Sequence, residues 1–500
     1  MSEPTLSKPN LVVGSAGLLT ASIMLATIMQ VLDTTIANVA LPHMASSLNA
    51  TQEEITWVLT SYIVASAIAT PVTGWAAVRL GRRSVMLTCI AGFVLSSMLC
   101  GIATGLPEMV VFRIFQGIFG AAIIPLAQSI LLDINPREKF GQAMAIYGAG
   151  IMVGPIAGPT LGGYLTEIFN WRYVFLINIP VGLLAFLGVM AFLPAEQRKP
   201  RRFDFTGFAL LAVAIGALQL MLDRGQAVDW FASVEIVIYA GLMISGLWAF
   251  VIHCWGADDP FVDLGMFRDR NFVMGLVFIF VIGMTLFSGL ALLPPLLQRL
   301  LGYPVIETGL VMAPRGVGTM VSMLLVGRLV ARFDPRGLVL FGLLLTAWSL
   351  HLMTGMDTMM DSHLIIWTGV MQGFGLGFVF VPLSTLTFAT MPARFRSDGT
   401  AMFSLVRNVG SGVGISMVTV VLARMSSVNH EELASTLTAQ SPAVRTSLPG
   451  LLDGSSQLAA IVEGLASQQA AMIAYLDNFF LMMILTVAAI PIVFLLRRPT

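Results

Sequence analysis

The sequence predicts an all-α membrane protein with fourteen helical spans, arranged as two six-helix bundles with two extra central helices between them. Three observations lead to this fold class: a shortage of charged residues, a series of long apolar runs, and a repeat within the chain. Of the 500 residues, 57% are hydrophobic and 11% are charged, whereas a soluble domain carries about 25% charged residues. Because the shortage extends along the whole chain, it indicates a polytopic membrane protein and not a soluble domain with one anchor.

The composition also argues against several kinds of site. The formal net charge is zero, so nothing favours a nucleic-acid partner. Cys89, Cys100 and Cys254 lie in or beside apolar segments and are too scattered for a disulfide framework or a metal site. The chain also lacks a phosphate-binding Gly-x-x-x-x-Gly-Lys loop. We therefore expect no metal, no bound cofactor and no use of ATP.

Runs of about 20 apolar residues mark the predicted spans. One connection, 425–473, is much longer than the others and is rich in Ser, Ala and Gln; it is compatible with an amphipathic helix or a mobile segment, and we assign it no fold. The spans are predicted at 14–41, 55–78, 84–104, 108–131, 141–165, 173–193, 206–224, 233–254, 271–293, 308–331, 337–355, 364–390, 400–424 and 474–496.

Basic residues predict the orientation, because short cytoplasmic connections are enriched in Lys and Arg. They gather on alternate connections, which places 19 of the 27 basic residues on one side of the membrane. Both termini are therefore expected in the cytoplasm, and the 425–473 connection outside. The residues on the predicted cytoplasmic side are Lys8, Arg79, Arg82, Arg83, Arg137, Lys139, Arg198, Lys199, Arg201, Arg202, Arg268, Arg270, Arg328, Arg332, Arg336, Arg394, Arg396, Arg497 and Arg498.

Short motifs recur within the chain at a nearly constant offset of 253 to 258 residues. Six spans with short loops occupy roughly 190–200 residues, so the excess of about 60 corresponds to two further spans. The predicted organisation is a six-span bundle at 1–195, two inserted spans at 196–265 and a second bundle at 266–500, with a substrate site between parallel halves near the midplane. The repeated motifs are Gly74–Arg83 with Gly327–Arg336, Gln116-Gly117 with Gln372-Gly373, Pro125-Leu126 with Pro382-Leu383, and Gly141–Met144 with Gly399–Met402.

Asp33 is the most informative single residue. No charged residue occurs from Leu11 to Leu32, and the next charge after Asp33 is Glu53. A lone carboxylate at that depth is costly, so it is expected to carry a proton or to pair with a cation. Arg113 is predicted at a similar depth in the fourth span and is the expected neighbour. The alternative is that Asp33 only caps a helix break or forms a structural pair.

The motifs together resemble the major facilitator superfamily, and within it the fourteen-span drug:proton antiporters typified by the EmrB multidrug exporter. The resemblance covers nearly the whole chain. It rests on Leu32–Pro42, the Gly74–Arg83 loop, Arg113 with Gln116-Gly117, the Gly150–Pro159 Gly-Pro repeat, Trp171-Arg172, Leu222–Trp230 and Pro260–Asp263.

The resemblance implies a role for the Asp33 and Arg113 pair. Asp33 would be the proton and cation site, and Arg113 a gate or relay that tunes it. A nearby arginine favours the ionised carboxylate, whereas loss of water favours the protonated form. A conformational change that separates the two would therefore drive proton capture.

Two further elements take their expected roles from the resemblance. The loop of Gly74, Arg79, Gly81, Arg82 and Arg83 would be a gating latch, although Val78 replaces the family's usual Asp and leaves the latch's carboxylate contact open. The positive charge of this loop is equally explained by the enrichment of Lys and Arg in cytoplasmic connections, which orients the chain in the membrane.

The fifth span has glycine at every fourth position, which places the glycines on one ridge, where a neighbouring backbone can approach closely. Prolines are expected to kink this span. The resemblance makes it a hinge and a seal against leak, and the alternative is general membrane packing. The residues are Gly150, Gly154, Pro155, Gly158, Pro159 and Gly162.

Polar residues on otherwise apolar helices are candidates for the substrate cavity. Arg315 and Arg407 could each contact an anionic substrate group or stabilise the second half. The 30 Met and 31 Phe residues suit a promiscuous pocket or a lipid-facing surface equally. The candidates are Asn38, Gln116, Gln128, Gln298, Arg315, Arg407 and Asn408, with Asn178 as a further polar position.

The expected function is proton-coupled export of amphipathic or lipophilic compounds across a bacterial inner membrane, by alternating access and without enzymatic activity. The alternative is a dedicated exporter of one metabolite, siderophore or fatty acid on the same scaffold. A membrane sensor with no transport activity is a third possibility, but it would not need Asp33, Arg113 and the Gly-Pro ridge together. The resemblance also implies a periplasmic adaptor and an outer-membrane channel as partners.

Overall fold

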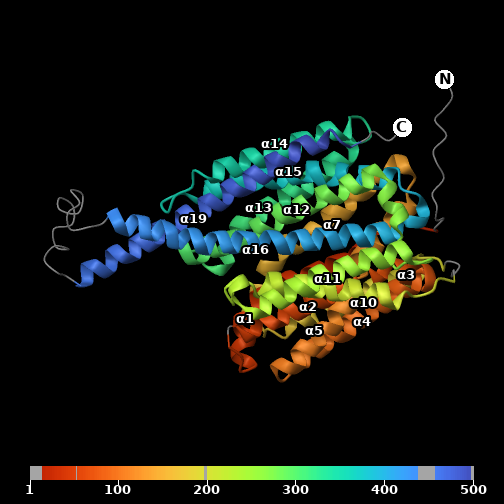
Figure 1. The fold of residues 1–500 in the computed structure, drawn as a ribbon, viewed down its shortest axis with the longest axis horizontal. Coiled ribbons are helices and arrows are strands. Elements are labelled where there is room, and N and C mark those ends of the chain that lie inside the picture. The colour runs from red at the N-terminus through yellow and green to blue at the C-terminus, as the bar shows by residue number, and fades with distance from the viewer. Residues whose placement is uncertain (1–13, 52, 196–199, 437–455, 497–500) are drawn as a thin grey trace.

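The computed structural model describes residues 14–51, 53–195, 200–436 and 456–496, and this part of the chain is helical with no β-strand (Figure 1). Five of the basic residues used to predict orientation lie outside the described residues, as does the centre of the 425–473 connection. These basic residues are Lys8, Arg198, Lys199, Arg497 and Arg498.

The first half runs from α1 to α9, and three of its six spans are each built from two consecutive helices. Its helices are α1 (Ala16–Ser47), α2 (Trp57–Ala69), α3 (Val72–Leu80), α4 (Arg82–Ile102), α5 (Leu106–Gly120), α6 (Ile123–Ile134), α7 (Phe140–Ile168), α8 (Tyr173–Leu176) and α9 (Asn178–Phe192).

The inserted pair and the second half follow. The inserted helices are α10 (Phe205–Arg224) and α11 (Val234–Gly256). The second half contains α12 (Arg270–Pro295), α13 (Val305–Leu329), α14 (Pro335–Met353), α15 (Ser362–Ala389), α16 (Arg396–Thr436) and α19 (Ser456–Val493).

The predicted number of spans is confirmed in the described chain. Thirteen helical segments are long and apolar enough to cross a membrane, and the pair α2 and α3 makes a fourteenth span with a bend of 56°. The break in that pair falls at Thr70 and Pro71, where proline removes a backbone donor. The first span extends beyond its predicted end at 41, since α1 continues through Pro42 to Ser47.

The two ends of the bundle differ in chemistry. The helices of both halves run from one end of the bundle to the other. The beginning of α1 and the end of α19 lie at the same end (Figure 1). This end, which we call the basic end, carries arginines on its connections and at the adjoining helix ends: Arg79, Arg82, Arg201, Arg332 and Arg396. The opposite end, which we call the hairpin end, carries the end of α16 and the beginning of α19.

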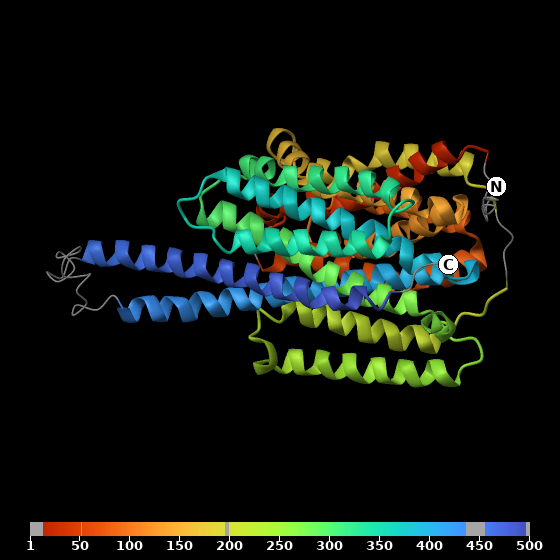
Figure 2. The same cartoon turned by 90° about the horizontal axis from the view of Figure 1, so that it is seen from above.

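The predicted limits of the last two spans were wrong, because both helices continue far past the apolar segments. Helix α16 continues beyond residue 424 to Thr436, and α19 begins at Ser456 instead of 474. The two helices project from the bundle as an antiparallel pair (Figure 2), and the imidazole of His430 contacts the carboxylate of Glu463 at 2.8 Å. Hydropathy locates the edge of the bilayer, whereas Ser, Ala and Gln can extend a helix into water.

The repeat in the sequence corresponds to equivalent contacts in the two halves. A Cβ on Gly117 of α5 would lie 2.5 Å from the carbonyl oxygen of Tyr62 in α2, and a Cβ on Gly373 of α15 would lie 2.0 Å from the carbonyl oxygen of Arg315 in α13. Only glycine permits these close approaches. Tyr62 and Arg315 therefore occupy equivalent positions in the two halves.

Candidate functional site

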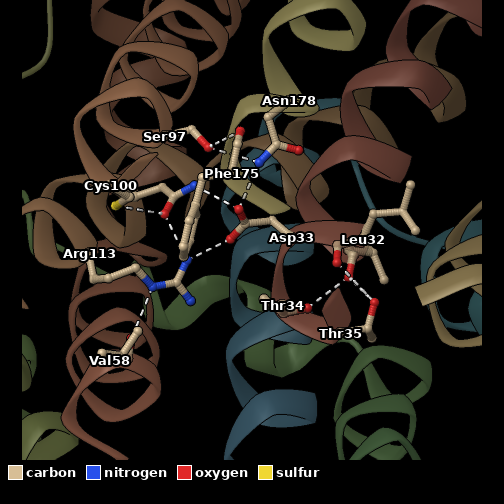
Figure 3. Close-up of polar contacts among 12 residues, drawn as sticks. Leu32, Asp33, Thr34, Thr35, Val58, Ser97, Cys100, Arg113, Phe175 and Asn178 are labelled. Carbon is tan, nitrogen blue, oxygen red and sulfur yellow. Dashed lines mark hydrogen bonds and ion pairs between the residues drawn. The ribbon is translucent and has the colours of Figure 1, made fainter. Parts of the chain in front are cut away.

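Asp33 lies at the centre of a buried polar cluster in the first half (Figure 3). Its carboxylate accepts hydrogen bonds from Arg113 Nη1 at 2.7 Å, Gln116 Nε2 at 2.8 Å and Asn178 Nδ2 at 2.7 Å. The side chains of Asp33 and Arg113 have no solvent exposure. Arg113 and Gln116 come from α5 and Asn178 from α9, and they lie 80, 83 and 145 positions after Asp33 of α1.

Arg113 is held on every side. Its Nε donates to the carbonyl oxygen of Val58 at 2.9 Å, and Nη1 also donates to Gln116 Oε1 at 2.7 Å. The guanidinium carbon lies 4.4 Å from the ring centre of Tyr62 and 5.6 Å from that of Phe175. Nη2 has no hydrogen-bond partner in the described part of the chain. The cation is therefore stabilised by one carboxylate and two aromatic faces.

Three members of this cluster, Gln116, Asn178 and Ser97, were not predicted as members, and Gln116 was a cavity candidate instead. Asn178 was expected only as a polar position, and it also donates from Nδ2 to Ser97 Oγ at 2.9 Å. Ser97 donates in turn to the carbonyl oxygen of Phe175 at 2.9 Å. Serine often bonds to the backbone of its own helix, so no feature of the sequence indicated that Ser97 faces a buried amide.

A cavity of about 290 Å³ lies between the two halves. The first half lines it with α1, α2, α6 and α7, and the second half with α12, α13, α15 and α16. Its walls are mainly apolar, and Arg407 is the only formally charged residue among the lining residues that the structure describes. The polar lining residues are Gln30, Thr34, Tyr62, Ser66, Gln219, Arg407, Asn408 and Ser411.

The cavity candidates from the sequence separate into three groups. Arg407 and Asn408 line the cavity. Gln116 belongs to the Asp33 cluster, and Arg315 lies behind the wall, with its Nη2 3.4 Å from the carbonyl oxygen of the lining residue Leu286.

The remaining candidates do not line the cavity. Asn38 is exposed on α1, and Gln298 is exposed in a π-helical turn, Leu296–Leu300, after α12. Gln128 is buried, with its amide 3.6 Å from the sulfur of Met144. Conversely, Gln30 and Gln219 line the cavity but were not among the candidates. Both are polar residues on otherwise apolar helices and so met the criterion for candidates, but the sequence does not show which way their side chains face.

Methionine and phenylalanine contribute directly to the cavity wall. Met152 of α7, Met323 of α13, and Phe287 and Phe380 of the second half line it. These four residues lie at the cavity, as the pocket interpretation requires, and flexible thioethers and flat rings are suited to apolar ligands of different shapes. Other large apolar side chains face outward, such as Phe115, which is 48% exposed.

Tyr62 connects the cavity with the Asp33 cluster. Its side chain lines the cavity, and its ring also packs against the guanidinium of Arg113. Gln30 and Thr34 line the same cavity from α1, within one helical turn of Asp33. A ligand in the cavity is thus separated from the Asp33 and Arg113 pair by a single layer of side chains.

The glycine ridge of α7 faces α1 beside Asp33. A Cβ on Gly150 would lie 2.1 Å from Met24 Cε, and one on Gly154 would lie 2.4 Å from Val31 Cγ1. Gly158 and Gly162 meet Thr35 and Ile36 in the same way. The helix runs without interruption through Pro155 and Pro159. Small residues therefore let α7 lie directly against the turn of α1 that holds Asp33.

The gating loop contacts the second half at the basic end. Arg82 forms an ion pair with Asp133 at the end of α6, and the same carboxylate pairs with Arg396 at the start of α16. Asp133 therefore supplies a carboxylate although Val78 replaces the expected Asp. A Cβ on Gly74 would overlap Asp398 of α16, at 1.8 Å from its Oδ1.

The other loop residues have separate positions. Gly81 has a φ of 86°, which favours glycine, and it joins α3 to α4. Arg83 Nη2 donates to the carbonyl oxygen of Met190 at 2.7 Å. Arg79 is exposed.

Comparison with known proteins agrees with this architecture. The family model described as Major Facilitator Superfamily matches residues 23–415. The chain is 35% identical over 443 residues to "Multidrug export protein EmrB" of Escherichia coli K12, covering 87% of this chain and 86% of that protein. It is 37% identical over 487 residues to "Fatty acid resistance protein FarB" of Neisseria gonorrhoeae, covering 96% of both chains.

Solved structures show the same fold at low sequence identity. The human organic anion transporter MFSD10 is similar with a TM-score of 0.60 and 16% identity, covering 94% of this chain and 99% of that chain. The proton:xylose symporter XylE is similar with a TM-score of 0.57 and 14% identity, covering 94% of each chain.

Proposed function

Because the chain belongs to the major facilitator superfamily, we propose that it is a proton-coupled antiporter that exports amphipathic or lipophilic compounds by alternating access. It is a multi-pass protein of the bacterial inner membrane, with the basic end in the cytoplasm because short cytoplasmic connections are enriched in Lys and Arg. The observation that carries the proposal is the fully buried Asp33 and Arg113 pair, one layer of side chains from the cavity.

Proton uptake follows from the electrostatics of this pair. With Arg113 at 2.7 Å, ionised Asp33 is compensated. If Arg113 moves away, the buried carboxylate loses its cation, and an uncompensated buried charge costs several kcal/mol. Asp33 then takes up a proton, which removes the cost. Return of Arg113 favours the ionised form and releases the proton.

Tyr62 is the proposed link between substrate and proton. Its ring supports the guanidinium of Arg113 and also lines the cavity. A bound substrate that packs on the ring would hold Arg113 against Asp33 and so favour release of the proton. With the cavity empty, the ring and Arg113 would be free to move away, and Asp33 would take up a proton. Binding of the substrate and binding of the proton would then oppose each other through one side chain, as antiport requires.

The test uses purified protein in proteoliposomes with an imposed pH gradient. We expect Asp33→Asn to abolish substrate flux driven by the gradient, because an amide cannot exchange a proton. The control is Asp258→Asn, which changes an exposed carboxylate in the connection after α11. Retention of gradient-driven flux by Asp33→Asn would sink the mechanism.

The charge of the cavity favours neutral and anionic substrates. Among the described residues that line the cavity, only Arg407 is charged, and Arg315 adds a second cation behind Leu286. An organic cation would meet uncompensated positive charge there, whereas a carboxylate can pair with a guanidinium. The name of the FarB relative, a fatty acid resistance protein, is consistent with this preference.

A matched pair of ligands tests the substrate class. Decanoate and decanamide have the same chain and differ in charge, so Arg407→Gln should weaken decanoate binding by about tenfold and leave decanamide nearly unchanged. A panel of competitors then separates a multidrug exporter from a dedicated exporter of one metabolite, siderophore or fatty acid, which would show one dominant substrate. Equal losses for the two ligands would contradict a role for Arg407 in recognising charge.

The projecting pair of α16 and α19 is the proposed contact for a periplasmic adaptor, which would lead to an outer-membrane channel. Gln468 donates to the carbonyl oxygen of Leu300 at the hairpin end, so α19 residues before it extend beyond the bundle. Ile461 and Leu465 are more than half exposed on this projection. Replacing both by Ser should reduce co-purification with the cognate adaptor but spare flux in proteoliposomes, and unchanged co-purification would contradict this contact.

A further inference from the structure

The two halves meet along two seams beside the cavity, and these seams are closed differently. At one seam, α7 packs directly on α13: a Cβ on Gly316 would lie 2.0 Å from Ile156 Cγ1, and one on Gly309 would lie 3.2 Å from Thr160 Oγ1. At the other seam, α3 packs on α16 at the basic end, but α2 shows no comparable packing on α16 within the described chain. The inserted helix α10 lies there and packs against both α2 and α16.

Helix α10 is joined to α2 of the first half by a polar contact and by close packing. The hydroxyl of Thr60 donates to the carboxylate of Asp223. About two turns earlier on α10, a Cβ on Gly216 would lie 3.1 Å from Ile68 Cδ1. A hydrogen bond and a close contact on the same face hold the two helices in one register.

The contact of α10 with α16 of the second half is different. Leu222 and Gln219 lie against Gly412, where a Cβ would be 3.3 Å from Leu222 Cδ1 and 3.5 Å from Gln219 Nε2. A glycine offers a smooth surface with no side chain to interlock. This contact permits sliding more readily than the α2 contact does.

Gln219 also reaches the cavity. It lies at the boundary between the two halves, where it lines the cavity together with Asn408 and Gly412 of α16 and Tyr62 of α2. It is buried, with 9% exposure. A buried amide at the edge of an apolar cavity has donors and an acceptor to offer to a ligand.

The second inserted helix, α11, covers α10 on its other side. Imidazole Nε2 of His253 lies 2.9 Å from the carboxylate of Asp204 at the basic end, and Arg224 pairs with Glu235 at the hairpin end. Trp248 of α11 is 71% exposed, as expected for a lipid-facing side chain. The pair thus forms one unit at the edge of the bundle, beside α16 (Figure 2).

We propose that α10 is the lateral wall of the substrate cavity, that it moves with the first half and slides over Gly412, and that Gln219 contacts the substrate. This rests on the proposed transport function, since it names a specificity residue of the same cavity. The inserted pair would close the α2 and α16 seam against lipid while the halves rock, which the α7 and α13 seam achieves by direct packing.

Two cysteine pairs test the movement of α10 in proteoliposomes. The pair Leu222→Cys with Gly412→Cys links α10 to α16, and the pair Ile68→Cys with Gly216→Cys links α10 to α2. Each protein is compared with itself before treatment with a short thiol cross-linker and after reversal. We expect the first link to reduce flux at least about tenfold and the second to change it less than about twofold, because rocking shears only contacts between the halves.

The outcomes separate this proposal from the transport proposal. Absence of flux in the unaltered protein would overturn the function, whereas flux in the cysteine variants before cross-linking followed by equal inhibition, or no inhibition, in both pairs would overturn the movement of α10. Inhibition by the α2 link alone would assign α10 to the second half and also overturn it.

Binding measurements test Gln219 directly. We expect Gln219→Leu to weaken decanamide binding by about tenfold, with partial recovery in Gln219→Asn, because the amide supplies hydrogen bonds inside an apolar site. Gln226→Leu, on the exposed connection after α10, is the matched control. If Gln219→Leu binds decanamide as well as the unaltered protein does, the contact is refuted, and this readout does not depend on proton coupling.

Discussion

Gly117 in the first half and Gly373 in the second half make the same backbone contact, but the residues that they contact differ. Gly117 lies on Tyr62, whose ring supports Arg113, and Arg113 is paired with Asp33. Gly373 lies on Arg315, for which no acidic side chain is a partner in the described part of the chain. The first half therefore carries a compensated buried ion pair, to which we assign proton exchange, and the second half carries uncompensated positive charge.

This difference teaches that duplicated helices need not share a function. The contacts that assemble each half require glycine at equivalent positions, and both halves keep them. The polar residues around these contacts are free to differ, so the first half can carry the pair proposed for proton exchange while the second presents cations to the cavity. Four predictions break or sharpen this comparison, ordered by their expected effect on transport.

The largest effect is expected from Arg113→Gln. Removing one partner of a buried ion pair costs about 3–5 kcal/mol if the other charge remains, so Asp33 should stay protonated and gradient-driven flux should fall at least about 100-fold. Flux in proteoliposomes and thermal unfolding in detergent measure this. The double variant with Asp33→Asn should recover stability but not flux, and near-normal flux in the single variant would contradict the assigned pair.

The next effect concerns the ion pairs of Asp133 with Arg82 and Arg396, which join the two halves at the basic end. Arg396→Gln removes a cation that pairs with Asp133, so the basic end should open more often. We expect alkylation of a cysteine introduced at Ser397, which contacts Ser129 across the halves at 3.3 Å, to increase about fivefold, since this shift corresponds to about 1 kcal/mol.

Gly327 is the second half's counterpart of Gly74, and its contact with the first half is apolar. A Cβ on Gly327 would lie only 2.4 Å from Ala145 Cβ. Gly327→Ala should open the basic end by steric contact. Arg396→Lys should restore closure in part, because it keeps the charge but loses the planar fork. Unchanged alkylation in Arg396→Gln would mean that the ion pairs do not hold the basic end closed.

A smaller effect on transport is expected from Arg315→Met, and its effect on stability should be opposite to that of Arg113→Gln. A buried guanidinium without a carboxylate partner is costly to desolvate, so replacing it by an apolar side chain of similar length should raise the free energy of unfolding by about 1 kcal/mol. Decanoate flux should fall only about threefold, because Arg407 remains in the cavity. A loss of stability like that of Arg113→Gln would show that Arg315 is compensated after all.

The smallest effect on transport is expected where the halves are equivalent. Gly117→Ala and Gly373→Ala should each lower the free energy of unfolding by about 1–3 kcal/mol, because an added methyl overpacks the helix contact, and should change flux less than about twofold once folded. Gly163→Ala is the control, since no neighbouring helix in the described chain comes within 4 Å of the position that its methyl group would take. A loss in only one half would show that the equivalence is superficial.

Much of this architecture followed from linear features. Fourteen apolar runs and the repeat offset predicted the spans. The isolated charge of Asp33 and the depth of Arg113 predicted a neighbour relation that the structure contains at 2.7 Å. The spacing of Gly150, Gly154 and Gly158 predicted one ridge, because residues four apart share a helix face.

Other features could not be derived in this way. Gln219 and Gln298 are both amides next to apolar residues, yet the first lines the cavity and the second is exposed. Asp133 is the carboxylate of the gating loop's ion pair although it lies 51 residues after Arg82. Which way a side chain faces depends on the neighbours of its helix, and these come from distant parts of the chain.

The sequence by itself determined that the chain crosses the membrane many times, that two halves repeat, and that one carboxylate is stranded among apolar residues. Hydropathy and helical periodicity are local properties, and they require no knowledge of packing. Only the tertiary structure decided that Tyr62 stands between the cavity and Arg113, and that α10 fills the seam between α2 and α16. Those relations depend on how helices from both halves and the inserted pair fit together, which no single segment encodes.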